Sequence, residues 1–172
     1  MLHSFRGHAP QIAADAWIAA SAVVVGDVVI GAQSSVWFHT VVRGDVAAIR
    51  IGARTNLQDH VVVHVFGGRS ATTIGDDVTI GHRALLHGCT IGNRALIGMG
   101  AILLDGAEIG DECLIGAGSL VPPGTKIPAR SLALGNPARF VRPLKDEERD
   151  SLKESAARYV GYAAEYRAAG IA

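Results

Sequence analysis

The sequence of 172 residues is poor in aromatic side chains, in cysteine and in net charge, and each shortage excludes a class of protein. Aromatic residues make up 5% and hydrophobic residues 49%, so the core must be aliphatic. The formal net charge of zero gives no electrostatic reason to expect a nucleic acid or an anionic membrane as a partner. The two cysteines, Cys89 and Cys113, match neither a disulfide framework nor a cysteine-type zinc site.

Long apolar runs are also missing. No stretch approaches the roughly 18 apolar residues that a membrane span needs, and residues 1–11 carry charged and histidine side chains instead of the apolar run of a secretory signal. We therefore expect a cytoplasmic protein without a membrane partner. The length favours one domain over residues 1–172.

The sequence does contain a repeat with a period of six residues. Aliphatic residues recur at this spacing without a break at Ile12, Ile18, Val24, Ile30, Val36 and Val42. The register resumes at Ile51, Leu57 and Val63, and after an insertion it continues from Ile74 to Val121. Many of these aliphatic residues are followed by one of the 21 glycines of the chain. Such a repeat indicates stacked units rather than separate elements.

A period of six fits neither an α-helix nor a simple amphipathic strand. It fits a triangular solenoid, in which three hexads form one coil and each aliphatic side chain points inward, about 4.8 Å from its equivalents in neighbouring coils. An ordinary β-sandwich does not keep one residue class at strict sixes. The sequence therefore predicts an all-β solenoid, a parallel β-helix of hexapeptide repeats over about residues 11–128.

The pattern changes towards the C-terminus. Pro122, Pro123 and Pro128 interrupt it, so we expect the hexad register to end near Val121. A C-terminal α-helix is predicted over about residues 145–169, since the acids at 146–148 suit a helix N-terminus. This helix is expected to pack along the solenoid or across a subunit boundary.

Three of the seven histidines occupy informative positions. Counting hexads places His64 and His87 at the same position of one face in successive coils, so both point outward and can share a metal ion. His82 lies at a corner and diverges from them within one chain. A neighbouring subunit could supply its own His82, which predicts a C3 homotrimer with metal sites at its interfaces. Three histidines with an open fourth position form the pattern of catalytic zinc.

The other histidines are interpreted differently. His39 and His60 share a face position and are predicted not to bind metal. His3 and His8 are expected to lie in a disordered or loosely held terminus.

Several motifs resemble the γ-carbonic anhydrase family, in its short bacterial branch, over essentially the whole chain. They are carried by residues 35–37, 42–45, 51–59, 63–65, 80–82, 86–92, 97–101 and 135–139, among them Val42-Arg43-Gly44-Asp45 and Leu86-His87-Gly88-Cys89. The resemblance implies a left-handed coil, a trimer, and Zn²⁺ held by His64, His82 and His87, with Fe²⁺ or Co²⁺ as other candidates.

The resemblance also implies roles for four polar residues. Arg43 and Asp45 match residues that form ion pairs at the subunit interface. Gln58 and Asp59 match residues beside the zinc, where the glutamine orients a water or bicarbonate. Counting hexads agrees in part, since Arg43 aligns with His64, and Asp59 lies one coil below His82, where it can accept a hydrogen bond from a metal ligand.

The expected reaction is the reversible hydration of carbon dioxide to bicarbonate, for which a proton shuttle is needed in fast enzymes. Active family members carry a glutamate after the Arg-x-Asp unit, where this chain has Val46, and an acidic loop where residues 65–73 contain Arg69 and no acid. We therefore expect modest to undetectable activity. The alternatives are a non-catalytic trimeric metal-binding scaffold, a metal-dependent acyl-CoA thioesterase and a hexapeptide acyltransferase.

Overall fold

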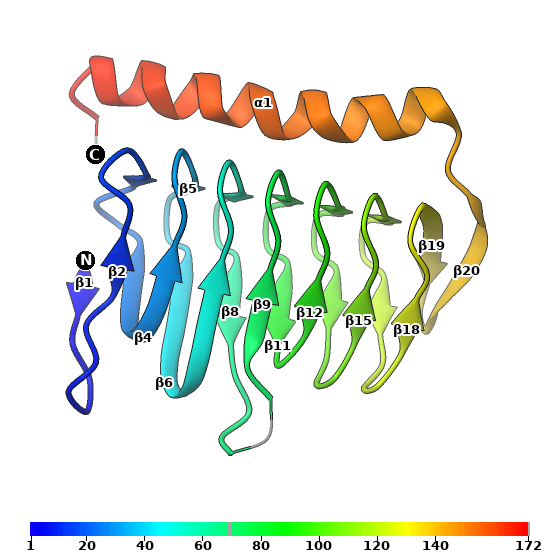
Figure 1. Cartoon of the computed structure of the whole chain (residues 1–172), viewed down its shortest axis with the longest axis horizontal. Helices are drawn as coiled ribbons and strands as arrows, with labels where there is room; N and C mark the ends of the chain where they lie inside the picture. The colour runs from blue at the N-terminus through cyan, green and yellow to red at the C-terminus, as the bar shows by residue number, and fades with distance from the viewer. Residues whose placement is uncertain (69, 172) are drawn as a thin grey trace.

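The computed structural model describes residues 1–68 and 70–171, and it is a parallel β-solenoid with one helix laid along it (Figure 1). The predicted all-β solenoid of hexapeptide repeats with a C-terminal helix is confirmed. Successive coils pair in parallel throughout, as a solenoid with one chain direction requires. Arg69 of the sequence analysis lies outside the described residues.

Three flat faces make up the solenoid. Two long strands, β4 (Val23–Ile30) and β6 (Val41–Ile51), turn a corner and join faces A and C into one sheet. Face A continues through β2 (Gln11–Ile12), β9 (Thr72–Ile74), β12 (Thr90–Ile91), β15 (Glu108–Ile109) and β18 (Lys126–Ile127). Face C continues through β1 (Leu2–His3), β8 (Val62–His64), β11 (Leu85–His87), β14 (Ile102–Leu103) and β17 (Leu120–Val121).

Face B forms a sheet of its own. It contains β3 (Trp17–Ile18), β5 (Ser35–Val36), β7 (Asn56–Leu57), β10 (Thr79–Ile80), β13 (Leu96–Ile97), β16 (Leu114–Ile115) and β19 (Ser131–Gly135). A last strand, β20 (Ala138–Pro143), pairs antiparallel with β19 and closes this sheet. The chain thus ends its solenoid on the face that the helix then covers.

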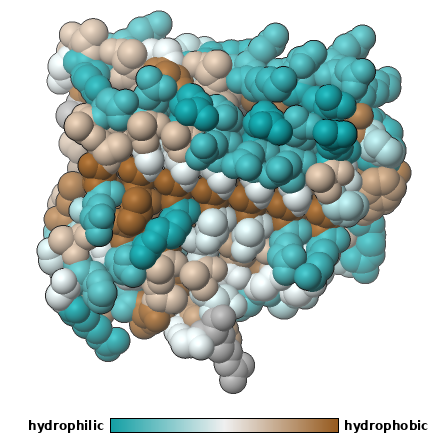
Figure 2. Space-filling view, in the orientation of Figure 1, coloured by the Kyte–Doolittle hydropathy of each residue, from teal (hydrophilic) through white to brown (hydrophobic). Residues whose placement is uncertain are grey.

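The aliphatic hexad residues stack in register inside the solenoid. Leu57 pairs with Ile80 on face B, and Val63 pairs with Leu86 on face C, all of them 0% exposed. Burying each such side chain stabilises the fold by roughly 1.5–3 kcal/mol. On the side seen in Figure 2, a continuous hydrophobic row crosses the coils below the more hydrophilic helix. Stacking of one residue class at a fixed period therefore supplies most of the core.

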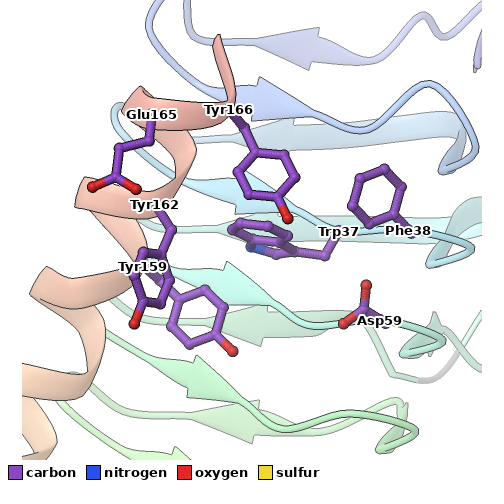
Figure 3. Close-up of a pocket in the computed structure, with 7 residues that line it drawn as sticks. All are labelled: Trp37, Phe38, Asp59, Tyr159, Tyr162, Glu165 and Tyr166. Atoms are coloured by element: carbon purple, nitrogen blue, oxygen red, sulfur yellow. The ribbon is translucent and has the colours of Figure 1, made fainter. Parts of the chain in front are cut away.

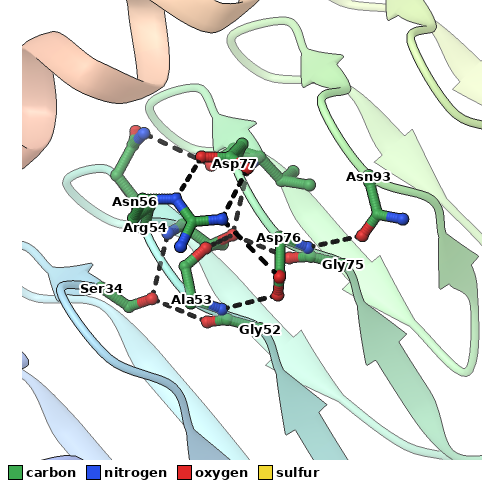
Figure 4. Close-up of polar contacts among 11 residues, drawn as sticks. Ser34, Gly52, Ala53, Arg54, Asn56, Gly75, Asp76, Asp77 and Asn93 are labelled. Atoms are coloured by element: carbon green, nitrogen blue, oxygen red, sulfur yellow. Dashed lines mark hydrogen bonds and ion pairs between the residues drawn. The ribbon is translucent and has the colours of Figure 1, made fainter.

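A ladder of polar side chains satisfies the backbone at one corner (Figure 4). The Ala53 N–H donates to Asp76 Oδ1 at 2.8 Å, the Asp76 N–H to Asn93 Oδ1 at 2.9 Å, and the Asn93 N–H to Asp111 Oδ1 at 2.7 Å. A Cβ atom at Gly75 would lie 2.6 Å from Asn93 Oδ1. The glycine that follows the aliphatic residue is thus needed there because the next coil approaches closely.

The solenoid continues beyond Val121, so the expectation that the hexad register ends there is wrong. β18 pairs with β15, and Leu132 of β19 pairs with Leu114 of β16. Pro122 and Pro123 follow β17 and Pro128 follows β18, the last strands of faces C and A, so no further coil requires an N–H from these residues. Proline therefore interrupts the pattern of the sequence without interrupting the strand stack.

Helix α1 (Asp146–Ala168) lies along face B, where it contacts β3, β5, β7 and β10. It buries Leu152, Ala156 and Ala163 against the strands. Of the two packing partners expected from the sequence, the helix thus packs on the solenoid of its own chain. Beyond its end, the Trp17 indole N–H donates to the Ile171 carbonyl at 3.1 Å. No helix in the part of the chain that the structure describes is long and apolar enough to cross a membrane.

The N-terminal segment is ordered against the solenoid, so the expectation of a loosely held terminus is wrong. His3 lies in β1, which pairs in parallel with β4, and His8 forms a bridge with Phe5. The terminal strand finds its partner because β4 would otherwise leave a row of backbone groups unpaired at the edge of face C.

Candidate metal centre

His64 and His87 lie side by side on face C, in the paired strands β8 and β11. His64 Nδ1 and His87 Nε2 are 3.1 Å apart, and the side chains are 19% and 28% exposed. Two nitrogen ligands of a tetrahedral zinc ion stand about 3.3 Å apart when the Zn–N bonds are about 2.0–2.1 Å. The predicted stacking of the pair is confirmed, and its nitrogen atoms have nearly the spacing that a shared metal ion requires.

A carboxylate holds the other nitrogen of each imidazole. His64 Nε2 lies 2.9 Å from Asp45 Oδ1, and His87 Nδ1 lies 2.6 Å from Asp105 Oδ1. A carboxylate in this position fixes the tautomer and the ring orientation of a metal-binding histidine and makes its free nitrogen a better ligand. The donor set therefore fits a divalent metal that prefers imidazole.

His82 lies at the corner between faces B and C, and it has a carboxylate partner of its own. Its Nδ1 atom is 2.8 Å from Asp59 Oδ2, as the count of hexads predicted, and the two side chains are 38% and 32% exposed. The backbone N–H of His82 donates to Gln58 Oε1 at 3.2 Å. The Gln58 side-chain amide in turn donates from Nε2 to Asn56 Oδ1 at 3.3 Å, so both ends of this buried amide are held.

The three predicted ligands do not come together within one chain. Among residues 1–68 and 70–171, no group of three or more histidine, cysteine, aspartate or glutamate side chains is placed to hold a metal ion. His64 and His87 form a pair, while His82 is held apart at its corner by Asp59. Completion of the site by His82 of a second chain remains a prediction.

Arg43 and Asp45 form an ion pair beside His64. Partial burial acts to raise the pKa of the Asp45 carboxyl, but hydrogen bonds from His64 and Arg43 outweigh it and hold that pKa below its usual range. The Arg43 side chain remains 46% exposed. Asp45 thus connects a candidate metal ligand to a cation that is still accessible to a neighbouring molecule.

Sequence reasoning missed Asp105, the partner of His87. It follows Leu103 by two positions, in the coil after that of His87, and its carboxylate reaches back across the corner at Gly88. A Cβ atom at Gly88 would lie 2.4 Å from Asp105 Oδ1. The register pairs Leu86 with Leu103, which places Leu104 opposite His87, so the hexad count alone does not indicate Asp105.

The two positions without the acids of active family members lie next to each other. A Cβ atom at Gly67, in the loop after β8, would lie 3.3 Å from Val46 Cβ. The Phe66 ring of that loop is 6.5 Å from the His87 ring, centroid to centroid. Val46 and Phe66 therefore place two apolar side chains on the loop side of the imidazole pair.

The remaining stacked pair, His39 and His60, lies at the corner between faces B and C, next to Asp59 in the sequence and away from the His64–His87 pair. The rings are 5.1 Å apart and nearly parallel, with 16° between their planes. Both residues have a positive φ, as corner positions of this solenoid do. Their assignment as non-ligands remains a prediction.

The sequence matches a family model and several named relatives. The family model described as bacterial transferase hexapeptide (six repeats) matches residues 71–103 and 88–123. The chain is 60% identical to a protein of Methanocaldococcus jannaschii named "Probable carbonic anhydrase", over 83% of this chain and 89% of the relative. It is 46% identical to gamma carbonic anhydrase 1, a mitochondrial protein of Arabidopsis thaliana, over 88% of this chain but only 57% of the relative.

A solved structure with the same fold has been described with a different activity. A Bacillus cereus protein, described only provisionally as an acetyltransferase, superposes with a TM-score of 0.95 at 45% identity. The match covers 98% of this chain and 97% of that one. The fold is therefore shared by proteins to which two different activities have been attributed.

Proposed function

Because the chain belongs to the γ-carbonic anhydrase family, we propose that it hydrates carbon dioxide to bicarbonate at a Zn²⁺ site shared between the subunits of a homotrimer. His64 and His87 of one subunit and His82 of the next are the proposed ligands. Fe²⁺ and Co²⁺ suit the same imidazoles. A cytoplasmic location remains a prediction.

One observation carries the proposal: the separation of 3.1 Å between His64 Nδ1 and His87 Nε2, with a carboxylate behind each ring. Carboxylates on both outer nitrogens are the arrangement that metal-binding histidines have. The Asp59–His82 contact repeats the same arrangement at the other corner. Three imidazoles, each oriented by a carboxylate, are what a catalytic site with one open position needs.

The outer surface of face C supports the homotrimer. Its outward positions form an unbroken aliphatic row through six coils, consisting of Val23, Val41, Val62, Leu85, Ile102 and Leu120. Face A carries Arg50, Thr73, Glu108 and Lys126 at the equivalent positions. Continuous apolar surface on a protein marks an interaction site. This row, which we call the face C row, runs beside His64 and His87, so a subunit packed on it would bring its His82 corner to the pair.

Zinc is known to lower the pKa of a coordinated water towards neutrality in a carbonic anhydrase with three histidine ligands. Around it, the residues of this chain would orient and shield the reactants. Gln58 donates one Nε2 hydrogen to Asn56, and the second is the one that we propose for a reacting oxygen. Phe66 and Val46 place apolar side chains on the loop side of the site.

We expect release of the proton to be the slow step of the proposed reaction. The described residues of the loop after β8 contain no acid, and Val46 stands beside them. A proton must then leave to a buffer molecule, which makes the rate depend on the buffer. We therefore expect modest activity that rises with the concentration of an added imidazole buffer.

Stopped-flow measurement of carbon dioxide hydration on metal-loaded protein, beside His87→Ala, tests the function. Activity that vanishes in the variant would support the proposal. Full metal occupancy without activity would contradict it and favour a thioesterase or a scaffold. Binding of acetyl-CoA by metal-free protein would favour the acyltransferase reading that the Bacillus cereus relative suggests.

Asp105→Ala is expected to weaken metal binding by about 10- to 100-fold, the usual effect of removing the acceptor behind a metal-binding histidine. The reason is that His87 loses the group that fixes its tautomer. Competition with a chelator measures the affinity. Asp150→Ala, on the exposed side of α1, is the matched control and should leave the affinity unchanged. Equal affinity of both variants would show that Asp105 plays no part.

Ile102→Glu is expected to yield monomers that no longer bind metal tightly. The side chain is 38% exposed in the face C row, and a buried carboxylate there would lack a partner. Sedimentation measures the mass of the particle. Thr90→Glu on face A is the control and should preserve the assembly. A trimer that survives Ile102→Glu would place the interface elsewhere.

A further inference from the structure

A hollow of about 390 Å³ lies between α1 and the solenoid, beside the Asp59 corner. Five aromatic rings line it (Figure 3). Trp37 and Phe38 come from the solenoid, and Tyr159, Tyr162 and Tyr166 come from the helix. The chain has only nine aromatic residues, namely four phenylalanines, three tyrosines and two tryptophans. More than half of them, including every tyrosine, therefore converge on one hollow.

Part of this concentration packs the helix onto the solenoid, since Phe38, Tyr159 and Tyr166 lie partly buried against the core. Where α1 simply buries side chains against the strands it uses Leu152, Ala156 and Ala163. The rings instead meet edge-on around the hollow, with centroids of Trp37 and Tyr166 5.1 Å apart and those of Trp37 and Tyr159 5.4 Å apart. Tyr162 remains 41% exposed. The aromatic side chains thus pack the helix and also line the hollow beside it.

The charge of the hollow has one sign. Its two ionisable acids are Asp59, at the solenoid corner, and Glu165, on the exposed side of α1, and no lysine or arginine lines it. The Asp59 side chain is 32% exposed. Two carboxylates beside aromatic faces would attract a cation and repel an anion. Asp59 also contacts His82 Nδ1 at 2.8 Å, whereas a neutral apolar ligand would displace water from Glu165 without giving this acid a partner.

We infer that this hollow binds an organic cation of the quaternary ammonium type. The faces of aromatic rings carry a negative quadrupole that attracts cations, and cages of tryptophan and tyrosine are the usual receptors for methylated ammonium groups. A bare metal ion is a poor occupant because the rings offer it no ligand atoms. The inference goes beyond the proposed function and needs neither metal nor carbon dioxide hydration, although Asp59 lines the hollow and also contacts His82.

Titration calorimetry with choline on protein freed of metal by a chelator tests the inference. The control ligand is 3,3-dimethylbutan-1-ol, which has the same shape without the charge. We expect choline to bind and the alcohol to bind at least about ten-fold more weakly. The same measurement on metal-loaded protein should give the same ratio. Equal affinity for the two compounds, or no binding of choline, would overturn the inference.

Two variants at exposed positions test the residues without endangering the fold. Tyr162→Leu should weaken choline binding by about ten-fold, and Glu165→Gln by about three-fold. Glu154→Gln lies on α1 outside the hollow and should have no effect. Choline affinity that is unchanged in both Tyr162→Leu and Glu165→Gln would show that the cation binds elsewhere. Carbon dioxide hydration plays no part in any of these readings.

Discussion

Replacing His64 with alanine is expected to abolish tight metal binding, and mixing this variant with His82→Ala subunits is expected to restore part of it. Each proposed site takes His64 and His87 from one subunit and His82 from the next. In an equal mixture, a His82→Ala subunit offers an intact pair, and a His64→Ala subunit offers an intact corner. Random assembly in a closed ring then completes about a quarter of the sites.

The control for this experiment mixes His64→Ala with His87→Ala. Both changes damage the imidazole pair of face C, in which the two nitrogens lie 3.1 Å apart in one chain. No arrangement of these subunits completes a site, so no metal should return. Metal content after co-refolding and gel filtration gives the answer. Absence of metal in the first mixture, with trimers properly mixed, would contradict the intersubunit site.

Leu86→Ala is expected to lower the free energy of unfolding by about 2–5 kcal/mol, the usual range for a buried leucine cut back to alanine. Leu86 is 0% exposed and stacks between Val63 and Leu103 in neighbouring coils. The cavity left in a stack of coils has neighbours on both sides that cannot collapse without breaking the register. His87 follows in the same strand, so metal affinity should fall as well.

Leu2→Ala provides the matched control for stability. The same atoms are removed from a side chain that is 52% exposed, in the terminal strand β1. A change within about 0.5 kcal/mol is expected there. Denaturant unfolding of both variants gives the comparison. A loss at Leu86 no larger than that at Leu2 would mean that the aliphatic stack is not the source of stability.

The proposed metal centre and the aromatic hollow share one residue, Asp59. Asp59 contacts His82 Nδ1 at 2.8 Å and also lines the hollow. A cation seated beside Asp59 would therefore compete for the carboxylate that orients the corner histidine. Metal affinity measured with and without choline would detect that coupling, because linkage between two ligands is reciprocal.

Residue counting along the sequence determined the solenoid and most of the candidate centre. A solenoid keeps one chain direction and a nearly constant coil, so the number of residues between two positions decides which of them become neighbours. This is why His64 opposite His87, and Asp59 beneath His82, could be predicted before any coordinates. The prolines made the same count end too early. They lie after the last strands of faces C and A, where no further coil requires a backbone N–H.

Only the tertiary structure decided what lies across the faces. Asp105 reaches His87 around a corner, where side-chain direction and not residue number sets the contact. The helix could have packed on its own solenoid or on another subunit, and the fit of Leu152, Ala156 and Ala163 against face B decided this. That docking also creates the aromatic hollow. Its solenoid rings and its helix rings lie more than a hundred residues apart in the sequence, and the helix is outside the repeat that relates the coils.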